Sequence, residues 1–132
     1  MRLAFVSTVL SYPWGGADKL WTAAAEAAST DAHAVFVAAS PLTVAHTNVR
    51  HLATPGVVVH VRDSFTQFNG RRARWRQRVQ QWLKSPRSLL AALDAFQPDF
   101  IFVNQGGAFD ILIEDGLVEW LLAIHFPFAL IC

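Results

Sequence analysis

Five short apolar runs alternate with helix-length segments along this chain. The runs cover about residues 3–7, 35–39, 57–61, 100–103 and 128–131, and nearly every position in them is apolar. Strands that are buried on both faces have this composition, and parallel strands need long crossovers, usually helical, to connect them. The pattern therefore predicts an α/β domain with a doubly wound parallel sheet, strand order 3-2-1-4-5 and helices on both faces.

The segment after the first run predicts an Ala-rich helix. It begins near Ala17, and Asp18 lies at the positive end of its dipole. Residues 41–56, which follow the second run, are punctuated by Pro, Asn and Gly, so an irregular segment is expected there. Further helices are expected over 71–84, 86–96 and 108–123. The apolar stripe that the first helix turns to the sheet is expected to consist of Leu20, Trp21, Ala24, Ala25 and Ala28.

Two Gly-Gly pairs follow strands whose carboxyl ends meet at one edge of this sheet. Gly15–Gly16 follow the first strand, and Gly106–Gly107 follow the fourth, directly after Asn104 and Gln105. Ligands of doubly wound sheets bind beyond this edge, where glycine permits close backbone approach and helix N-termini attract anions. The alternative is two tight turns that need glycine for their geometry alone. A dinucleotide fingerprint is excluded, because the G-x-G-x-x-G spacing is absent.

The composition of the chain argues against a disulfide-bonded, a metal-binding and a membrane-spanning protein. The chain has 132 residues, of which 53% are hydrophobic, and a formal net charge of +1, so it fits one domain and its global charge indicates no partner. Cys132 is the single cysteine, so no intrachain disulfide is possible, and no Cys/His spacing suggests a metal. The longest apolar stretches fall short of the roughly 18 residues of a membrane span. We expect a cytoplasmic protein without metal or cofactor.

The cations gather in one segment. Residues 71–87 hold seven of the eleven Lys and Arg residues and no acid. A helix over 71–84 would place a stripe of tryptophans among arginines, which suits an anionic membrane surface or nucleic acid phosphates. Packing of the tryptophans on the sheet is the alternative. The predicted membrane-contact residues are Arg71, Arg72, Arg74, Trp75, Arg76, Arg78 and Trp82.

The chain opens with Arg2-Leu-Ala-Phe-Val-Ser7, and the loop Tyr12-Pro-Trp-Gly-Gly-Ala-Asp18 follows. These segments resemble the N-terminal domain of GT-B fold retaining glycosyltransferases, the family 4-like enzymes, in which the loop reads Pro-x-x-Gly-Gly-Ala-Glu. Ala32-His-Ala-Val-Phe-Val37 and Pro98-Asp99-Phe-Ile-Phe-Val103 are similar to the family's second and fourth strands with the turns before them. The resemblance implies the N-terminal half of a GT-B fold and transfer of a sugar from a nucleotide-sugar donor to a lipid-linked or saccharide acceptor.

The resemblance also assigns roles to single residues. Gly15 and Gly16 would lie against the donor diphosphate. Phe102 and Asn104 stand where the family has two histidines, so no catalytic histidine is carried over and no catalytic residue is assigned. The residues expected on the acceptor and sugar side are Trp14, Asn104, Gln105 and Gly106.

A second, C-terminal domain would complete such an enzyme. We expect residues 1–132 to form one Rossmann-like domain that lacks this nucleotide-sugar domain and is inactive in isolation. Its location would be cytoplasmic and peripheral on the inner face of the membrane, with no nucleic acid partner. The alternatives are a non-catalytic module that binds anionic membrane or nucleic acid through residues 71–84, and a flavodoxin-like domain that binds a phosphorylated ligand at Gly15–Gly16.

Overall fold

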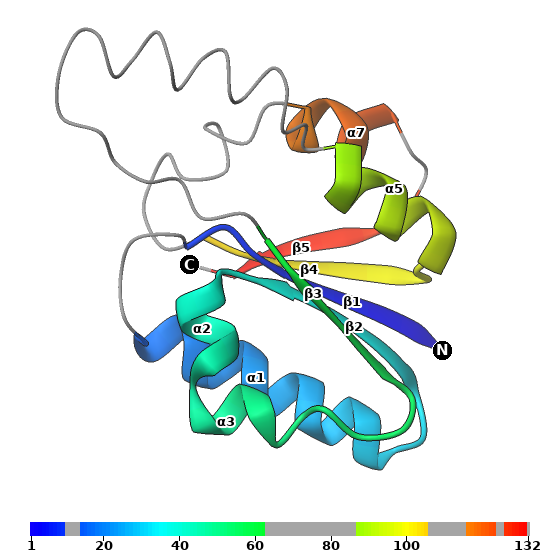
Figure 1. Cartoon of the computed structure of the whole chain (residues 1–132). Coiled ribbons are helices and arrows are strands. Elements are labelled where there is room, and N and C mark those ends of the chain that lie inside the picture. The colour runs from blue at the N-terminus through cyan, green and yellow to red at the C-terminus, as the bar shows by residue number, and fades with distance from the viewer. Residues whose placement is uncertain (10–13, 63–86, 106–115, 124–125, 132) are drawn as a thin grey trace, which may run out of the picture.

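The computed structural model describes residues 1–9, 14–62, 87–105, 116–123 and 126–131. Five strands form one sheet in the order β3-β2-β1-β4-β5, and every neighbouring pair is parallel, as the sequence predicts (Figure 1). This arrangement is that of a Rossmann-like α/β domain. The strands are β1 (Arg2–Ser7), β2 (Ala34–Ala39), β3 (Val57–Val61), β4 (Phe100–Asn104) and β5 (Phe128–Ile131).

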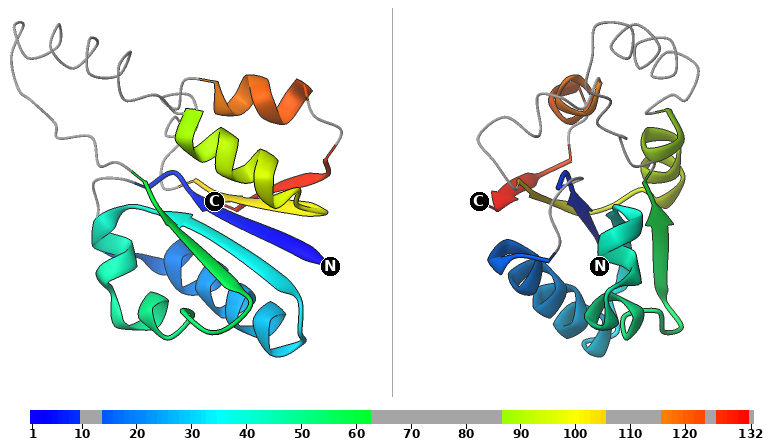
Figure 2. Two further views of the ribbon diagram at one scale, coloured as in Figure 1. Left: turned by 45° about the vertical axis from the view of Figure 1, so that its right-hand side comes forward. Right: turned by 60° about the vertical axis from the view of Figure 1, so that its left-hand side comes forward.

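Helices cover both faces of the sheet, which therefore forms the middle layer (Figures 1 and 2). One face carries α1 (Gly16–Thr30) with the short helices α2 (Pro41–Ala45) and α3 (Thr47–Arg50). The other face carries α5 (Arg87–Phe96) and α7 (Leu117–Ala123). None of the helices in the described ranges is long and apolar enough to cross a membrane.

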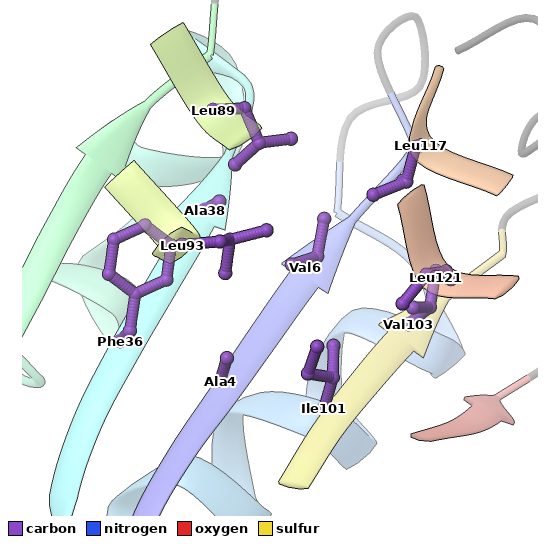
Figure 3. Close-up of a cluster of buried hydrophobic side chains, with 10 residues drawn as sticks. All are labelled: Ala4, Val6, Phe36, Ala38, Leu89, Leu93, Ile101, Val103, Leu117 and Leu121. Atoms are coloured by element: carbon purple, nitrogen blue, oxygen red, sulfur yellow. The ribbon is translucent and has the colours of Figure 1, made fainter. Parts of the chain in front are cut away.

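Side chains that alternate along the strands fill two separate cores, one on each face. Figure 3 shows the core beneath α5 and α7, where Leu93 lies over β2 and β1 and Leu121 lies over β4. The core beneath α1 is built around Trp21 and Phe5, and the ring of Phe5 stacks on that of Phe102 at 4.9 Å. The first core consists of Ala4, Val6, Phe36, Ala38, Leu89, Leu93, Ile101, Val103, Leu117 and Leu121.

The prediction that 41–56 is irregular was wrong, because this segment begins with two short helices. Ser40 is the N-cap of α2: its hydroxyl accepts the backbone N–H of Thr43 at 3.2 Å, and Pro41 occupies the first turn. Serine at the N-cap followed by proline is a standard helix start. The signal was present in the sequence but was outweighed by the Pro and Gly punctuation.

The predicted stripe of α1 was only partly right. Trp21, Ala25 and Ala28 are buried, but Leu20 is 59% exposed and Ala24 also faces outward. The buried face of α1 includes Asp18 and Thr22 instead. The pattern of apolar residues cannot reveal that Asp18 and Thr22 belong to the buried face, because both are polar.

The other helix predictions are confirmed where the structure describes them, except at Gly116, which is a turn residue. The helix expected over 86–96 is α5, and α7 forms the last part of the helix expected over 108–123. Gly116 precedes α7 with φ of 87°, a left-handed conformation that suits glycine. The helix expected over 71–84 lies outside the described residues.

Candidate ligand site at the carboxyl edge

Buried polar side chains gather where β1, β3 and β4 end and α1 begins. Ser7 and Asn104 are register partners at the ends of β1 and β4, Asp18 lies in the first turn of α1, and Arg62 directly follows β3. Asn104 is 1% exposed, Asp18 3% and Arg62 5%. These four residues form the carboxyl-edge cluster. In this fold the carboxyl ends of the strands are the usual place for a ligand.

The strands and α1 bring the cluster together by simple geometry. Register partners of neighbouring strands point to the same face, so Ser7 and Asn104 follow Phe5 and Phe102 on the α1 side of the sheet. Asp18 comes one helical turn before Trp21, which packs into the core on that side. The start of α1 and the ends of the strands lie at the same end of the molecule (Figure 1).

The carboxylate of Asp18 connects three parts of the domain. Its Oδ2 accepts the backbone N–H of Gly15 at 2.9 Å, which is the reciprocal half of a capping box. Its Oδ1 accepts the indole N–H of Trp21 at 3.0 Å and the side-chain amide of Asn104 at 3.3 Å. The sequence interpretation gave Asp18 only a role at the helix dipole and missed this network. An acid three residues after the N-cap was the available signal.

The side chain of Asn104 uses its nitrogen, but not its oxygen, in hydrogen bonds with the residues that the structure describes. Its Nδ2 donates to Asp18 and to the hydroxyl of Ser7, the latter at 3.3 Å. Its backbone oxygen accepts both the N–H and the hydroxyl of Thr8. Its side-chain Oδ1 is buried and accepts no hydrogen bond from any residue that the structure describes. Buried polar atoms are nearly always paired, so Oδ1 is a candidate acceptor for the hydrogen bond of a ligand.

Arg62 brings a positive charge into the cluster. Its guanidinium Nη1 donates to the backbone carbonyl of Ser7. Desolvation by burial lowers the pKa of Arg62 to about 10, so the side chain stays charged at neutral pH. The sequence interpretation did not single out this residue. Its position directly after an apolar strand was the only signal.

The N-terminus of α1 is open beside Gly16. A Cβ at Gly16 would meet no atom within 4 Å, and one at Gly15 would meet only Asp18 Oδ2 at 3.7 Å. Gly15 has extended backbone, with φ of −119° and ψ of −175°, and neither glycine has a positive φ. The backbone therefore does not require glycine here. Within the described parts of the chain, the N–H groups of Gly16, Ala17 and Asp18 make no hydrogen bond.

Trp14 and Gln105 were also predicted for the sugar side, and the structure gives each of them a partner outside the carboxyl-edge cluster. Trp14 is half-buried, and one face of its indole stacks on the ring of His46, with centroids 3.9 Å apart and planes 3° from parallel. His46 lies between α2 and α3, so this stack ties the loop before α1 to those helices. Gln105 follows β4 and donates its backbone N–H to Ile131 at 2.8 Å.

Several predicted residues cannot be placed in the cluster. Gly106 lies outside the described residues, and so do all the predicted membrane-contact residues: Arg71, Arg72, Arg74, Trp75, Arg76, Arg78 and Trp82. Across the described ranges, no three His, Cys, Asp or Glu side chains are grouped so that they could hold a metal ion.

Comparisons with protein-family models, curated proteins and solved structures found no match to this chain. The strand order and the all-parallel sheet define its fold class directly. The chain is a Rossmann-like α/β domain. Among the residues that the structure describes, its carboxyl edge holds the N-terminus of α1, with open space at Gly16, and a buried amide oxygen of Asn104 that accepts no hydrogen bond.

Proposed function

We propose that this chain is the N-terminal domain of a retaining glycosyltransferase of the GT-B type, which transfers a sugar from a nucleotide-sugar donor. The observation that supports this most is the pairing of two unlike sites at one sheet edge. The N-terminus of α1 at Gly16 suits a phosphate, and the Oδ1 of Asn104, which no described residue contacts with a hydrogen bond, suits a hydroxyl. A nucleotide-sugar carries both groups in one molecule.

The phosphate part of the donor would lie against Gly15–Gly16. Backbone N–H groups at a helix N-terminus and the helix dipole favour an anion, typically by about 0.3–1 kcal/mol for the dipole at exposed positions. The open space beside Gly16 would let phosphate oxygens approach the backbone. The positive charge of Arg62 at the same sheet edge adds to this attraction.

The sugar part would lie toward Asn104. Sugar hydroxyls can donate to an amide oxygen, and the Oδ1 of Asn104 is an acceptor that no described residue uses. These two kinds of group support one orientation of the donor, with phosphate at α1 and sugar near β4.

The resemblance of the loop Tyr12-Pro-Trp-Gly-Gly-Ala-Asp18 to the family motif is a second support. The acid of this motif is Asp18, which accepts the N–H of Gly15 before α1 and the side-chain amide of Asn104 on β4. These hydrogen bonds explain why an acid stands at this position of the motif. Transfer would need groups from both walls of a cleft around an oxocarbenium-like transition state. A second Rossmann-like domain would provide the other wall and most of the nucleotide contacts.

The acceptor is proposed from composition alone. The basic segment 71–87 would hold the domain on an anionic membrane, where each cation near the surface contributes about 1 kcal/mol. A lipid-linked acceptor would then be presented at the membrane surface close to the sheet edge.

Calorimetric titration of the chain with UDP-glucose and GDP-mannose tests the proposal. We expect weak binding of at least one donor, and its loss in Gly16→Val, because the added side chain fills the space at the helix N-terminus. Ala23→Val is the matched control, since Ala23 is an exposed position of α1 away from the site. Binding that survives Gly16→Val, or that both variants weaken equally, would remove the glycine loop from the site.

A further inference from the structure

We propose that Asn104 acts only as a hydrogen-bond acceptor toward the ligand and that Asp18 is the positioning residue that fixes it so. The ligand group that meets Asn104 is then a hydroxyl, as sugars carry, and not a phosphate oxygen. This inference rests on the proposed sugar-transfer site and specifies which part of the ligand lies where.

The orientation of the Asn104 amide follows from its neighbours. One side of the amide faces Asp18 Oδ1 and Ser7 Oγ, both at 3.3 Å. With Nδ2 on that side, both of its protons are donated. With the amide reversed, Oδ1 would face the carboxylate oxygen with no proton between two acceptors, which is repulsive. The nitrogen therefore points inward and Oδ1 points away from Asp18.

Asp18 is itself held in place, so it can hold Asn104. Besides Asn104, its carboxylate accepts the N–H of Gly15 and the indole N–H of Trp21. Trp21 is fully buried in the core beneath α1. The carboxylate is thus tied to the helix start and to the core, and it cannot turn to accommodate a reversed amide.

An amide whose orientation is fixed, as that of Asn104 is, selects ligand groups that donate a hydrogen bond to its oxygen. Both Nδ2 protons are used, so Asn104 has nothing to donate to an ionised phosphate or carboxylate. The buried Oδ1 needs a proton donor. Hydroxyl and N–H groups of a ligand supply one. The sugar hydroxyls of a donor fit this requirement, while its phosphate belongs at Gly16.

The inference is tested with glucose 1-phosphate and inorganic phosphate as probes, titrated into the 132-residue chain and followed by ¹H–¹⁵N NMR. We expect glucose 1-phosphate to bind about fivefold more tightly, the effect of one added hydrogen bond. In Asp18→Asn the amide of Asn104 is free to reverse, and the preference should fall to near parity while phosphate still binds. Thr22→Val is the matched control: Thr22 is buried on α1 and bonds the Asp18 backbone oxygen, not its carboxylate.

The side-chain NH₂ signals of Asn104 give a readout that needs no ligand. They should exchange slowly with solvent in the wild type and in Thr22→Val, and faster in Asp18→Asn. Should Asp18→Asn fail to fold, Asn104→Ala serves as the second variant, and it should also abolish the preference for glucose 1-phosphate.

The outcomes separate the two proposals. If neither probe binds, the proposed function fails at the glycine loop and the inference fails with it. If phosphate binds and glucose 1-phosphate binds no better, the inference is wrong while the phosphate site stands. A preference that persists unchanged in Asp18→Asn, with slow NH₂ exchange, would show that Asp18 does not position Asn104.

Discussion

Asp18 makes more hydrogen bonds within this domain than a position in the first turn of a helix suggests. It is a buried acid in a first helical turn, and its carboxylate accepts hydrogen bonds from Gly15 before the helix, from Trp21 on the same helix and from Asn104 at the end of β4. Hydrogen bonds to a charged group contribute about 1.5–3 kcal/mol each, and a buried donor left without its acceptor is costly. The residue thus links stability to the geometry of the site.

We predict that Asp18→Ala destabilises the domain by about 2–4 kcal/mol, because the buried donors of Trp21 and Asn104 lose their acceptor. Urea denaturation followed by circular dichroism measures this change. Glu26→Ala is the control, since Glu26 is an exposed acid on the same helix, and it should change stability by less than about 0.5 kcal/mol. A similar small loss for both variants would show that the Asp18 network adds little to stability.

The candidate site was only partly predictable from single residues. Asn104 was found because it directly follows an apolar run. Gly15–Gly16 were found because they stand between the first run and the helix after it, and the carboxyl ends of parallel strands meet at one edge. Asp18 and Arg62 were not recognised as members of the cluster. Their burial depends on what the folded neighbours supply, such as the indole N–H of Trp21 and the carbonyl of Ser7. A pattern of polar and apolar positions does not contain that information.

Among the elements, α2 shows that a cap can outweigh helix-breaking residues. Ser40 is fully buried, and its hydroxyl contacts both the N–H and the hydroxyl of Thr43, at 3.2 and 3.0 Å. Pro41 has no N–H to satisfy and is preset for the first helical turn. Since α2 follows β2 directly, the cap also decides how the chain leaves the carboxyl edge.

We predict that Ser40→Ala costs about 1 kcal/mol of stability, the usual effect of removing a serine N-cap. Thermal denaturation of the two proteins measures it. Ser40→Asn restores a capping oxygen and should recover part of the loss if the buried position admits the larger side chain. A melting temperature unchanged in Ser40→Ala would show that α2 is held by packing alone.

On the scale of the whole molecule, the apolar pattern was sufficient for the topology. The run 35–39 is buried on both faces, and the helix-length crossovers between the parallel strands leave few alternatives to the order β3-β2-β1-β4-β5. The pattern was weaker at α1, where exposed Leu20 was assigned to the core and buried Thr22 was not. Tertiary packing decides such positions, because a helix facing a sheet edge can bury polar groups that find partners there.

Two leucines, one buried in the core beneath α5 and α7 and one exposed on α7, test how the helices pack on the sheet. Leu93 is fully buried between α5 and the sheet, whereas Leu122 on α7 is 72% exposed. We predict that Leu93→Ala lowers the free energy of unfolding by about 2–5 kcal/mol, and Leu122→Ala by less than about 0.5 kcal/mol. Chemical denaturation of the two variants measures both free energies of unfolding. Equal losses would contradict the placement of α5 over β1 and β2.

The carboxyl edge, between the N-terminus of α1 and Asn104, is where we expect a nucleotide-sugar to bind. This binding can be followed by a ¹H–¹⁵N NMR titration of the chain with UDP-glucose, and with GDP-mannose if the first gives no shifts. We predict saturable shifts that are largest at the amides of Gly15, Gly16 and Ala17 and at the side chain of Asn104. Largest shifts on the opposite edge of the sheet, or none with either donor at millimolar concentration, would contradict it.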